Sequence, residues 1–229
     1  MKVLVLPDAA AAADRAAGIL ADRLAEAPAS VLGLATGETM RPVYAALVRR
    51  HREAGLSLAA TTTFNLDEYV GVGPEHPASF AAFMRQELFD HVDIDPARVH
   101  LPRGDAPDPA AEAARYEGAI VAAGGIDLQL LVIGRNGHLA FNEPTSSLAS
   151  RTRIKTLTPS TRSANSAAFA PDAAPRQAIT MGLGTILDAR GCLLVATGES
   201  KAEAVATTIE GPLGAHCPAT VLQLHPAAT

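Results

Sequence analysis

Residues 126–138 read IDLQLLVIGRNGH, and this stretch decides the fold class. Its first eight residues, Ile126–Ile133, form a nearly continuous apolar run, as expected for a strand that is buried on both faces. Such strands belong to parallel sheets whose two faces are covered by helices. The run stops at Gly134, and a second glycine, Gly137, stands directly before His138. The sequence therefore predicts a buried strand that ends in a polar turn.

Strands and helices alternate on both sides of this run. Further strands are predicted at Lys2–Leu6, Ser30–Ala35, Thr61–Leu66, Arg151–Leu157, Cys192–Thr197 and Thr220–Leu224, and helices at Ala10–Ala25, Arg41–Arg52, Ala78–Phe89, Asp108–Ala123, Lys201–Ile209 and from Thr161 onward. This alternation predicts an α/β fold with a mainly parallel sheet. No linker rich in Pro, Gly and Ser interrupts it, so residues 1–229 are expected to form a single domain.

Composition and charge argue against several classes of protein. The 229 residues are 48% hydrophobic and 19% charged, which is typical of a globular protein, and the net charge of −5 disfavours nucleic-acid and anionic-membrane partners. No apolar run approaches the roughly 20 residues that span a bilayer. The N-terminal MKVLVLPDAA is predicted to be a strand and not a signal peptide. Cys192 and Cys217 lack metal-ligand spacing, and a cytoplasmic location is expected.

Three strand ends contain the residues that could perform chemistry, because ligands of parallel sheets collect beyond the carboxyl ends of the strands. The first is Thr36-Gly37-Glu38-Thr39, which leads into a helix. Backbone N–H groups at a helix N-terminus, together with threonine hydroxyls, can hold a phosphate. A plain capped helix start explains the same residues equally well.

The second and third strand ends offer groups for proton transfer. Asp67 and Glu68 are adjacent carboxylates at the end of an apolar strand, where burial could make one of them a general base near neutral pH. A solvated strand end with Asp67 capping a turn is the alternative. In the third, His138 follows the glycine turn and Glu143 lies five residues later. A nearby carboxylate can fix the tautomer of a histidine and raise its basicity.

Seven segments, in this order, resemble the glucosamine-6-phosphate deaminases. They are FNLDEYVG (64–71) with HPASFAAFM (76–84), GRNGHLAFNEP (134–144), SSLASRTRIKTL (146–157), AITMGLGTILDA (178–189), ATGESKAEA (196–204) and VLQLH (221–225). The resemblance extends from about residue 30 to the C-terminus. The related 6-phosphogluconolactonases are similar up to the histidine and then diverge, whereas FNEP is typical of the deaminase branch.

The resemblance implies a three-layer Rossmann-like α/β domain and a cofactor-free reaction. Glucosamine 6-phosphate and water would become fructose 6-phosphate and ammonia. His138 would assist opening of the pyranose ring, and Asp67 would move a proton from C2 to C1. Glu143 and Asn136 would orient and tune His138. Thr36, Gly37, Glu38, Thr39 and Lys201 would bind the substrate phosphate, and no metal is implied.

Three positions depart from the family pattern. Asn136 stands where many members have Asp. Glu38 lies in a phosphate loop that usually reads Thr-Gly-Gly/Ser-Thr-Pro, and Ala167 replaces an arginine that holds the phosphate. Because two phosphate-binding features change while the reacting centre is intact, an unphosphorylated or differently phosphorylated amino sugar is an alternative substrate. A phosphogluconolactonase-type hydrolase and a non-catalytic sugar sensor are weaker alternatives.

One segment resembles a regulatory site. Residues 146–156, with Ser146, Ser147, Arg153 and Lys155, are similar to the site at which oligomeric family members bind the effector N-acetylglucosamine 6-phosphate. There, neighbouring subunits contribute the phosphate contacts, so the resemblance implies a homo-oligomer. A charged β-edge is the simpler interpretation, since Arg153 and Lys155 would share one face of a strand.

Overall fold

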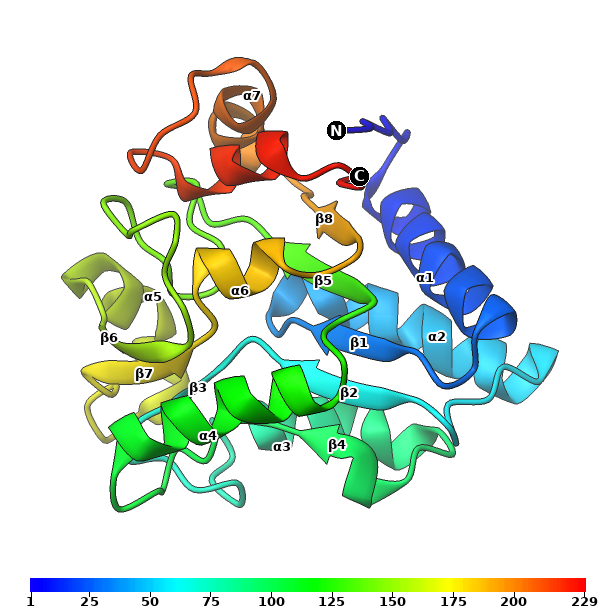
Figure 1. Ribbon diagram of the computed structural model, residues 1–229, viewed down its shortest axis with the longest axis horizontal. Helices are drawn as coiled ribbons and strands as arrows, with labels where there is room; N and C mark the ends of the chain where they lie inside the picture. Colours follow the sequence, from blue (N-terminus) through cyan, green and yellow to red (C-terminus); the bar gives the residue numbers. More distant parts are fainter.

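The computed structural model describes residues 1–229, apart from the side chain of Ala164. Five strands form the main sheet (Figure 1). Their order is β4 (Val99–His100), β2 (Thr62–Asn65), β1 (Val31–Leu34), β5 (Leu128–Val132) and β8 (Cys192–Val195), and every neighbouring pair is parallel. The apolar run Ile126–Ile133 thus contains β5, which lies between β1 and β8, and the prediction of a parallel sheet is confirmed.

Burial on both faces explains the nearly continuous apolar sequence of β5. Leu130 and Leu131 are completely buried, as expected for a strand with helices over both faces. Gln129, also completely buried, pairs in register with Gly33 of β1. A Cβ atom at Gly33 would lie 2.0 Å from the Gln129 side-chain oxygen, so the glycine makes room for the amide. A polar residue in the strand therefore has a matching small residue on its neighbour.

A second, antiparallel sheet begins where β2 ends. It consists of β3 (Asp67–Tyr69), β7 (Gln177–Thr180) and β6 (Arg153–Thr156), in that order. Leu66 joins the two sheets, because its N–H donates to Leu34 O at 3.0 Å and its carbonyl accepts from Met181 N at 2.8 Å. The sequence predicted only β6 of this sheet. Asp67 consequently lies at the first position of a short strand that turns away from the main sheet.

Helices cover both faces of the main sheet, giving the three layers that were expected. Figure 1 shows α2 (Arg41–Ala54) and α3 (Phe80–Glu87) behind the strands, and α4 (Pro109–Ala122) and α6 (Leu183–Leu187) in front. The remaining helices are α1 (Ala9–Glu26), which packs beside α2, α5 (Pro159–Phe169) and α7 (Ala202–Glu210). In the part of the chain that the structure describes, no helix has the length and apolarity needed to cross a membrane.

Two predicted strands are wrong. Residues Lys2–Leu6 have no strand structure, and Val5 is 90% exposed. The outer edge of β8 is bonded instead to the last residues of the chain, through Thr229 N to Cys192 O and Leu194 N to Thr229 O. A strand needs a partner for its ladder, and β propensity alone does not supply one.

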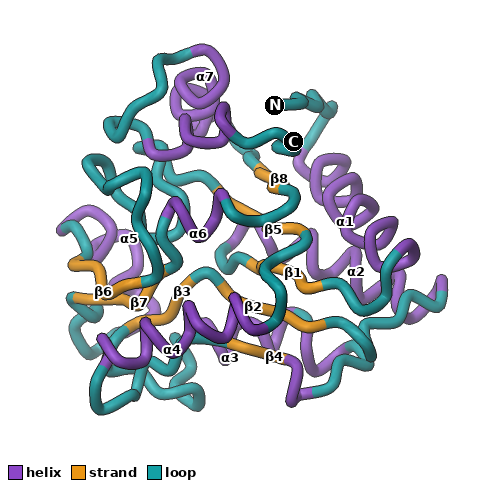
Figure 2. Tube along the Cα trace, in the orientation of Figure 1, coloured by secondary structure: helices purple, strands orange, loops and turns teal.

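The second wrong prediction is Thr220–Leu224, which belongs to the 3₁₀ helix η5 (Pro218–Leu224). Pro218 stands at its first position, where a missing N–H costs nothing and the fixed φ favours a helix. Val221 and Leu222 are completely buried. The apolar run therefore lies in the core as a 3₁₀ helix, and the prediction of extended backbone is wrong. Figure 2 shows this segment as helix, close to the chain end.

Candidate active site

The sheet order brings the predicted strand ends to one edge. Strands β2, β1, β5 and β8 are successive neighbours and run in the same direction, so the loops that follow them lie side by side. These loops contain Asp67 after β2, residues 36–39 after β1, residues 134–143 after β5, and Lys201 after β8. The structure therefore brings together all the residues predicted to act in catalysis or bind the substrate.

The two adjacent carboxylates point in different directions, as alternate residues of a strand do. Asp67 is 6% exposed, and no described residue hydrogen-bonds to its carboxylate. Burial raises the pKa of Asp67 well above its usual value, and the charge of Glu68 raises it further.

Glu68 is fully occupied by the backbone. Its carboxylate accepts hydrogen bonds from Tyr69 N at 2.9 Å, Phe80 N at 3.1 Å and Ala81 N at 3.0 Å, so it caps the N-terminus of α3. Burial raises the pKa of Glu68 to about 7, in spite of these three donors. Of the two carboxylates, Asp67 is the one left available for a ligand.

The glycine turn presents His138 to this edge. Gly134 N donates to His138 O at 2.9 Å, and Gly137 has a φ of 79°, which favours glycine. A Cβ atom at Gly134 would lie 2.2 Å from the imidazole, and one at Gly137 would lie 2.3 Å from Cys217 Sγ. Both glycines are therefore required: one lets the ring lie flat on the backbone, and the other lets the turn pack on the 3₁₀ helix η5.

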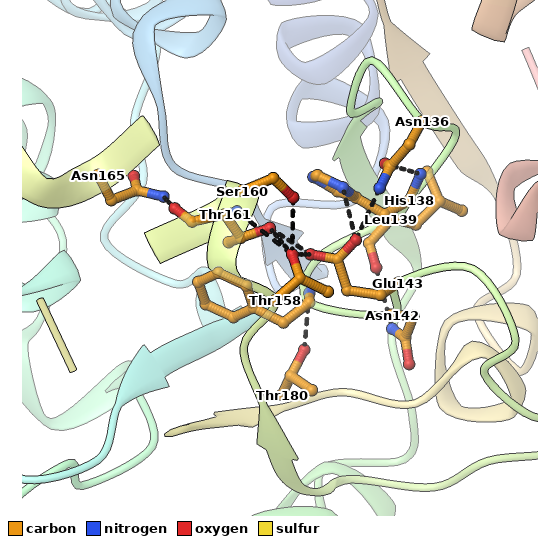
Figure 3. Close-up of polar contacts among 11 residues, drawn as sticks. Asn136, His138, Leu139, Asn142, Glu143, Thr158, Ser160, Thr161, Asn165 and Thr180 are labelled. Carbon is orange, nitrogen blue, oxygen red and sulfur yellow. Dashed lines mark hydrogen bonds and ion pairs between the residues drawn. The ribbon is translucent and has the colours of Figure 1, made fainter. Parts of the chain in front are cut away.

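Glu143 lies at the centre of a polar network (Figure 3). One carboxylate oxygen accepts from Asn136 Nδ2 at 2.7 Å and lies 3.6 Å from His138 Nδ1, and the other accepts from the hydroxyls of Thr158 and Thr161. Burial opposes ionisation of Glu143. The neighbouring His138, Thr161 and Asn136 outweigh burial and lower the pKa of Glu143 to about 2. Glu143 is thus a carboxylate at neutral pH.

The loops after β1 and β8, here called the paired loops, are similar in sequence and in backbone conformation. Residues 35–39 read ATGET and residues 196–200 read ATGES. Gly37 has a φ of 111° and Gly198 a φ of 85°, and each is followed by a short 3₁₀ helix that continues into α2 or α7. The two loops flank the His138 turn on either side. The prediction from sequence did not use this repeated motif, although the motif is the sequence signal for a site formed by two similar loops.

Glu38 points into solvent and is paired with an arginine. Its side chain is 86% exposed, and its carboxylate accepts from Arg41 Nε at 3.0 Å. Arg41 also pairs with Glu87, and its guanidinium lies 5.0 Å from the centre of the Phe83 ring. Arg41 therefore neutralises Glu38 and is itself engaged.

Two other cations lie beside the paired loops. Burial lowers the pKa of Lys201, and the positive charge of Arg135 lowers it further. Arg135 is exposed, and neither cation is ion-paired with a residue that the structure describes. Arg135 was not among the predicted site residues. Ala167 is exposed on α5.

The predicted effector segment lies on the outer strand of the small sheet. Arg153 and Lys155 are alternate residues of β6, and both are partly buried. Ser146 is 2% exposed and its hydroxyl has no described hydrogen-bond partner, whereas Ser147 is exposed. Arg151 is held by Glu117 and Asp188. Arg153 and Lys155 are far from Asp67 in sequence but belong to the same small sheet, since β6 and β3 both pair with β7.

Residues 7–229 match the protein family described as glucosamine-6-phosphate isomerases/6-phosphogluconolactonase. The chain belongs to this family. Within the glucosamine-6-phosphate isomerase/6-phosphogluconolactonase family, it is 52% identical to a glucosamine-6-phosphate deaminase of Cellvibrio japonicus, over all of this chain and 87% of that protein. It is 50% identical to a glucosamine-6-phosphate deaminase of an Arthrobacter species, over all of this chain and 88% of that one.

Solved structures of the family separate its two branches. A monomeric glucosamine-6-phosphate deaminase superposes with a TM-score of 0.97 and 44% identity, over all of this chain and 95% of that one. The 6-phosphogluconolactonase of Trypanosoma cruzi superposes with a TM-score of 0.79 and 19% identity, over all of this chain and 92% of that one. The second similarity shows the shared fold alone. The deaminase branch is thus the one that this chain resembles in sequence as well as in shape.

Proposed function

We propose that this chain converts glucosamine 6-phosphate and water to fructose 6-phosphate and ammonia. The observation that supports this most strongly is the identity of about half its residues with deaminases along the entire chain. The chemistry needs a base, a ring-opening acid–base group and an anion site. Asp67, His138 and a pair of cations lie at one edge of the sheet, where a single sugar phosphate could reach all three.

In the proposed mechanism, His138 moves a proton between the ring oxygen and O1 and so opens the pyranose. Asp67 then takes the proton from C2, giving an enolamine, and returns it to C1, giving the ketimine. Water adds to C2 of the ketimine, the C2–N bond breaks, and ammonia leaves together with the ketose. The raised pKa of Asp67 supports this role, since a base works best when its pKa lies near the working pH.

Glu143 and Asn136 are proposed to orient His138. Asn136 Nδ2 donates to Glu143, and Asn136 Oδ1 accepts from His138 N at 3.3 Å, so Asn136 spans the turn. An aspartate at position 136 would place a second negative charge 2.7 Å from the Glu143 carboxylate. The amide of Asn136 can donate to Glu143, which an ionised carboxylate at this position could not do.

A 6-phosphate is the proposed anionic group. The loops at Thr36–Thr39 and Gly198–Lys201 offer backbone N–H groups at two helix N-termini, which favour anions. Lys201 and Arg135 add two positive charges, and Arg41 neutralises Glu38. The departures at Glu38 and Ala167 are therefore compatible with a phosphorylated substrate. An unphosphorylated amino sugar would leave these two cations without a partner.

The test is to follow ammonia and ketose together. Purified protein is supplied separately with glucosamine 6-phosphate, free glucosamine and 6-phosphogluconolactone. We expect equal amounts of ammonia and fructose 6-phosphate from the first substrate alone. Faster turnover of free glucosamine would favour the shifted-substrate alternative. Lactone hydrolysis without ammonia release from the amino sugar would contradict the deaminase assignment.

Regulation and assembly are further proposals. The face of Arg153 and Lys155 is proposed to bind N-acetylglucosamine 6-phosphate, on the strength of the similarity of residues 146–156 to an effector site. A clasp between subunits would require a homo-oligomer, although the deaminase that superposes with a TM-score of 0.97 is described as monomeric. Light scattering with and without the effector measures the assembly state. A cytoplasmic location remains the expectation for such an enzyme.

A further inference from the structure

We propose that Thr161 and Thr158, at the start of α5, are positioning residues that hold Glu143 against His138. They would thereby connect α5 to the turn formed by Gly134–His138, here called the catalytic turn. This inference rests on the proposed function, because it assigns His138 a part in the reaction. Neither threonine was singled out by the sequence. Their assignment rests on the two oxygens of the Glu143 carboxylate, which accept hydrogen bonds from two different parts of the chain.

Each oxygen of Glu143 serves a different element (Figure 3). Oε2 faces the catalytic turn, where it accepts from Asn136 Nδ2 at 2.7 Å and lies 3.6 Å from His138 Nδ1. Oε1 faces α5, where it accepts from Thr161 Oγ1 and from Thr158 Oγ1, the latter at 3.2 Å. The carboxylate thus forms a bridge between the turn after β5 and the first turn of α5.

The hydroxyl of Thr161 has the clearer partner. Its single proton is donated to Glu143 Oε1. Thr158 caps α5 by accepting from Thr161 N at 3.2 Å, and its hydroxyl lies 3.2 Å from Glu143 Oε1, 3.0 Å from Thr161 Oγ1 and 2.9 Å from Ser160 Oγ. Thr161 therefore donates directly to the carboxylate, and Thr158 supports this contact by touching both Thr161 and Glu143.

Burial makes these donors important. Glu143 is 4% exposed and Thr161 is 9% exposed, so water cannot replace a lost hydroxyl. His138 is the one basic side chain within ion-pair distance of Glu143 among the described residues. A buried carboxylate that loses a donor interacts more strongly with those that remain or shifts its position. The threonine hydroxyls therefore set where Glu143 lies and how strongly it acts on His138.

The bridge also gives α5 an influence on the reaction at a distance. Asn165 Nδ2 donates to Thr161 O at 2.8 Å, and β6 ends at Thr156, two residues before Thr158. A movement of α5 or of β6 would change the donors of Oε1, and hence the geometry at His138, with no direct contact to the imidazole. A substrate or effector that orders this segment would act through the same carboxylate.

Matched variants separate this role from simple packing. Thr161→Val keeps the shape and removes the hydroxyl, whereas Thr161→Ser keeps the hydroxyl and removes the methyl group. We expect Thr161→Val to lower kcat about tenfold with KM within twofold, the size of one lost hydrogen bond to a charged group, and Thr161→Ser to stay within twofold of the parent. Thr61→Val is the control, because Thr61 is buried at the other end of β2 and its hydroxyl bonds to Pro28 O.

A double-mutant cycle tests the path through the histidine. In a His138→Gln background, Thr161→Val should change kcat less than twofold, because the residue on which Glu143 acts is already absent. Equal losses in both backgrounds, equal losses for Val and Ser, or a change confined to KM would overturn the proposal. Should Thr161→Val not fold, Thr161→Ala gives the same comparison with serine.

Thermal unfolding provides a readout that does not depend on the deaminase reaction. Because the pKa of Glu143 is lowered to about 2, its ionised form stabilises the fold above pH 4.5, and this stabilisation is lost as the pH falls towards 2. The gap in Tm between Thr161→Val and Thr161→Ser should therefore be larger at pH 7.5 than at pH 2.5, where Glu143 is becoming protonated. A gap that is independent of pH would overturn the proposal, whereas absence of ammonia release by the parent protein would count against the proposed function alone.

Discussion

Replacing Asp67 by asparagine should reduce activity and increase stability. The change is nearly isosteric and removes only the base. Loss of a general base typically costs about 10²–10⁴ in rate, or roughly 3–5 kcal/mol of transition-state stabilisation. We expect this fall in kcat, with KM for glucosamine 6-phosphate changed less than threefold, because Asp67 lies outside the paired loops proposed to hold the phosphate.

The gain in stability follows from burial. Glu68, with three backbone donors, still has its pKa raised from 4.5 to about 7, and this shift of about 2.5 units corresponds to about 3 kcal/mol at 1.36 kcal/mol per unit. Asp67 has no described donor, and its pKa is also raised by burial and by Glu68. An acid with a raised pKa destabilises the fold above its unfolded pKa, and that cost vanishes as the pH falls below about 4.

We therefore expect Asp67→Asn to raise the free energy of unfolding by about 1–3 kcal/mol at pH 8, with the gain disappearing near pH 4. Urea unfolding at the two pH values measures it, and coupled assays of ammonia and ketose measure kcat. Asp93→Asn is the matched control: hydrogen bonds from Ser57 and Leu58 outweigh burial and lower the pKa of Asp93, so this change should lower stability at pH 8 and leave kcat unchanged. Near-native turnover by Asp67→Asn would refute the proton-transfer role, and unchanged stability at pH 8 would refute the account of its burial.

Three further predictions concern other parts of the site. His138→Gln should reduce kcat more for the closed pyranose than for an open-chain analogue, and equal losses would assign His138 to structural support. N-acetylglucosamine 6-phosphate should raise the apparent substrate affinity, and Lys155→Ala should abolish that effect alone; kinetics that do not respond to this ligand would mean that the segment is an effector site in sequence only. For the phosphate, Arg135→Gln should raise KM for glucosamine 6-phosphate about tenfold. If position 167 still reaches the substrate, the double change Ala167→Arg with Glu38→Gly should raise kcat/KM at least tenfold, which corresponds to about 1.4 kcal/mol. If the parent enzyme has ordinary efficiency and the double change does not improve it, Arg135 and Lys201 suffice to bind the phosphate.

The sequence was informative wherever a pattern is local. The apolar run at β5 identified a doubly buried strand, and the alternation of strands and helices predicted the parallel sheet and the edge where ligands collect. Asp67, His138 and Glu143 could be selected because carboxylates and a histidine at strand ends are costly or unusual there. The family resemblance added the chemistry that they are expected to perform.

Other features needed the tertiary structure, because they depend on partners distant in the chain. Lys2–Leu6 has the composition of a strand, but the edge of β8 is occupied by the last residues of the chain. Glu38 is unfavourable for phosphate when judged from the sequence alone, whereas in the structure Arg41 pairs with both Glu38 and Glu87. Local propensity is encoded in neighbouring residues, whereas the neutralisation of a charge is decided by what folding places beside it.

Glu143 shows most clearly what the sequence determined and what the tertiary structure decided. The sequence by itself determined that a carboxylate follows the His138 turn and that its neighbours match a deaminase. Only the tertiary structure decided that the carboxylate is shared between Asn136 on one side and Thr158 and Thr161 on the other. Hydrogen bonds reach about 3 Å and are insensitive to separation along the chain, so residues 15 and 18 positions away became partners of Glu143 when β6 and α5 folded back over the turn.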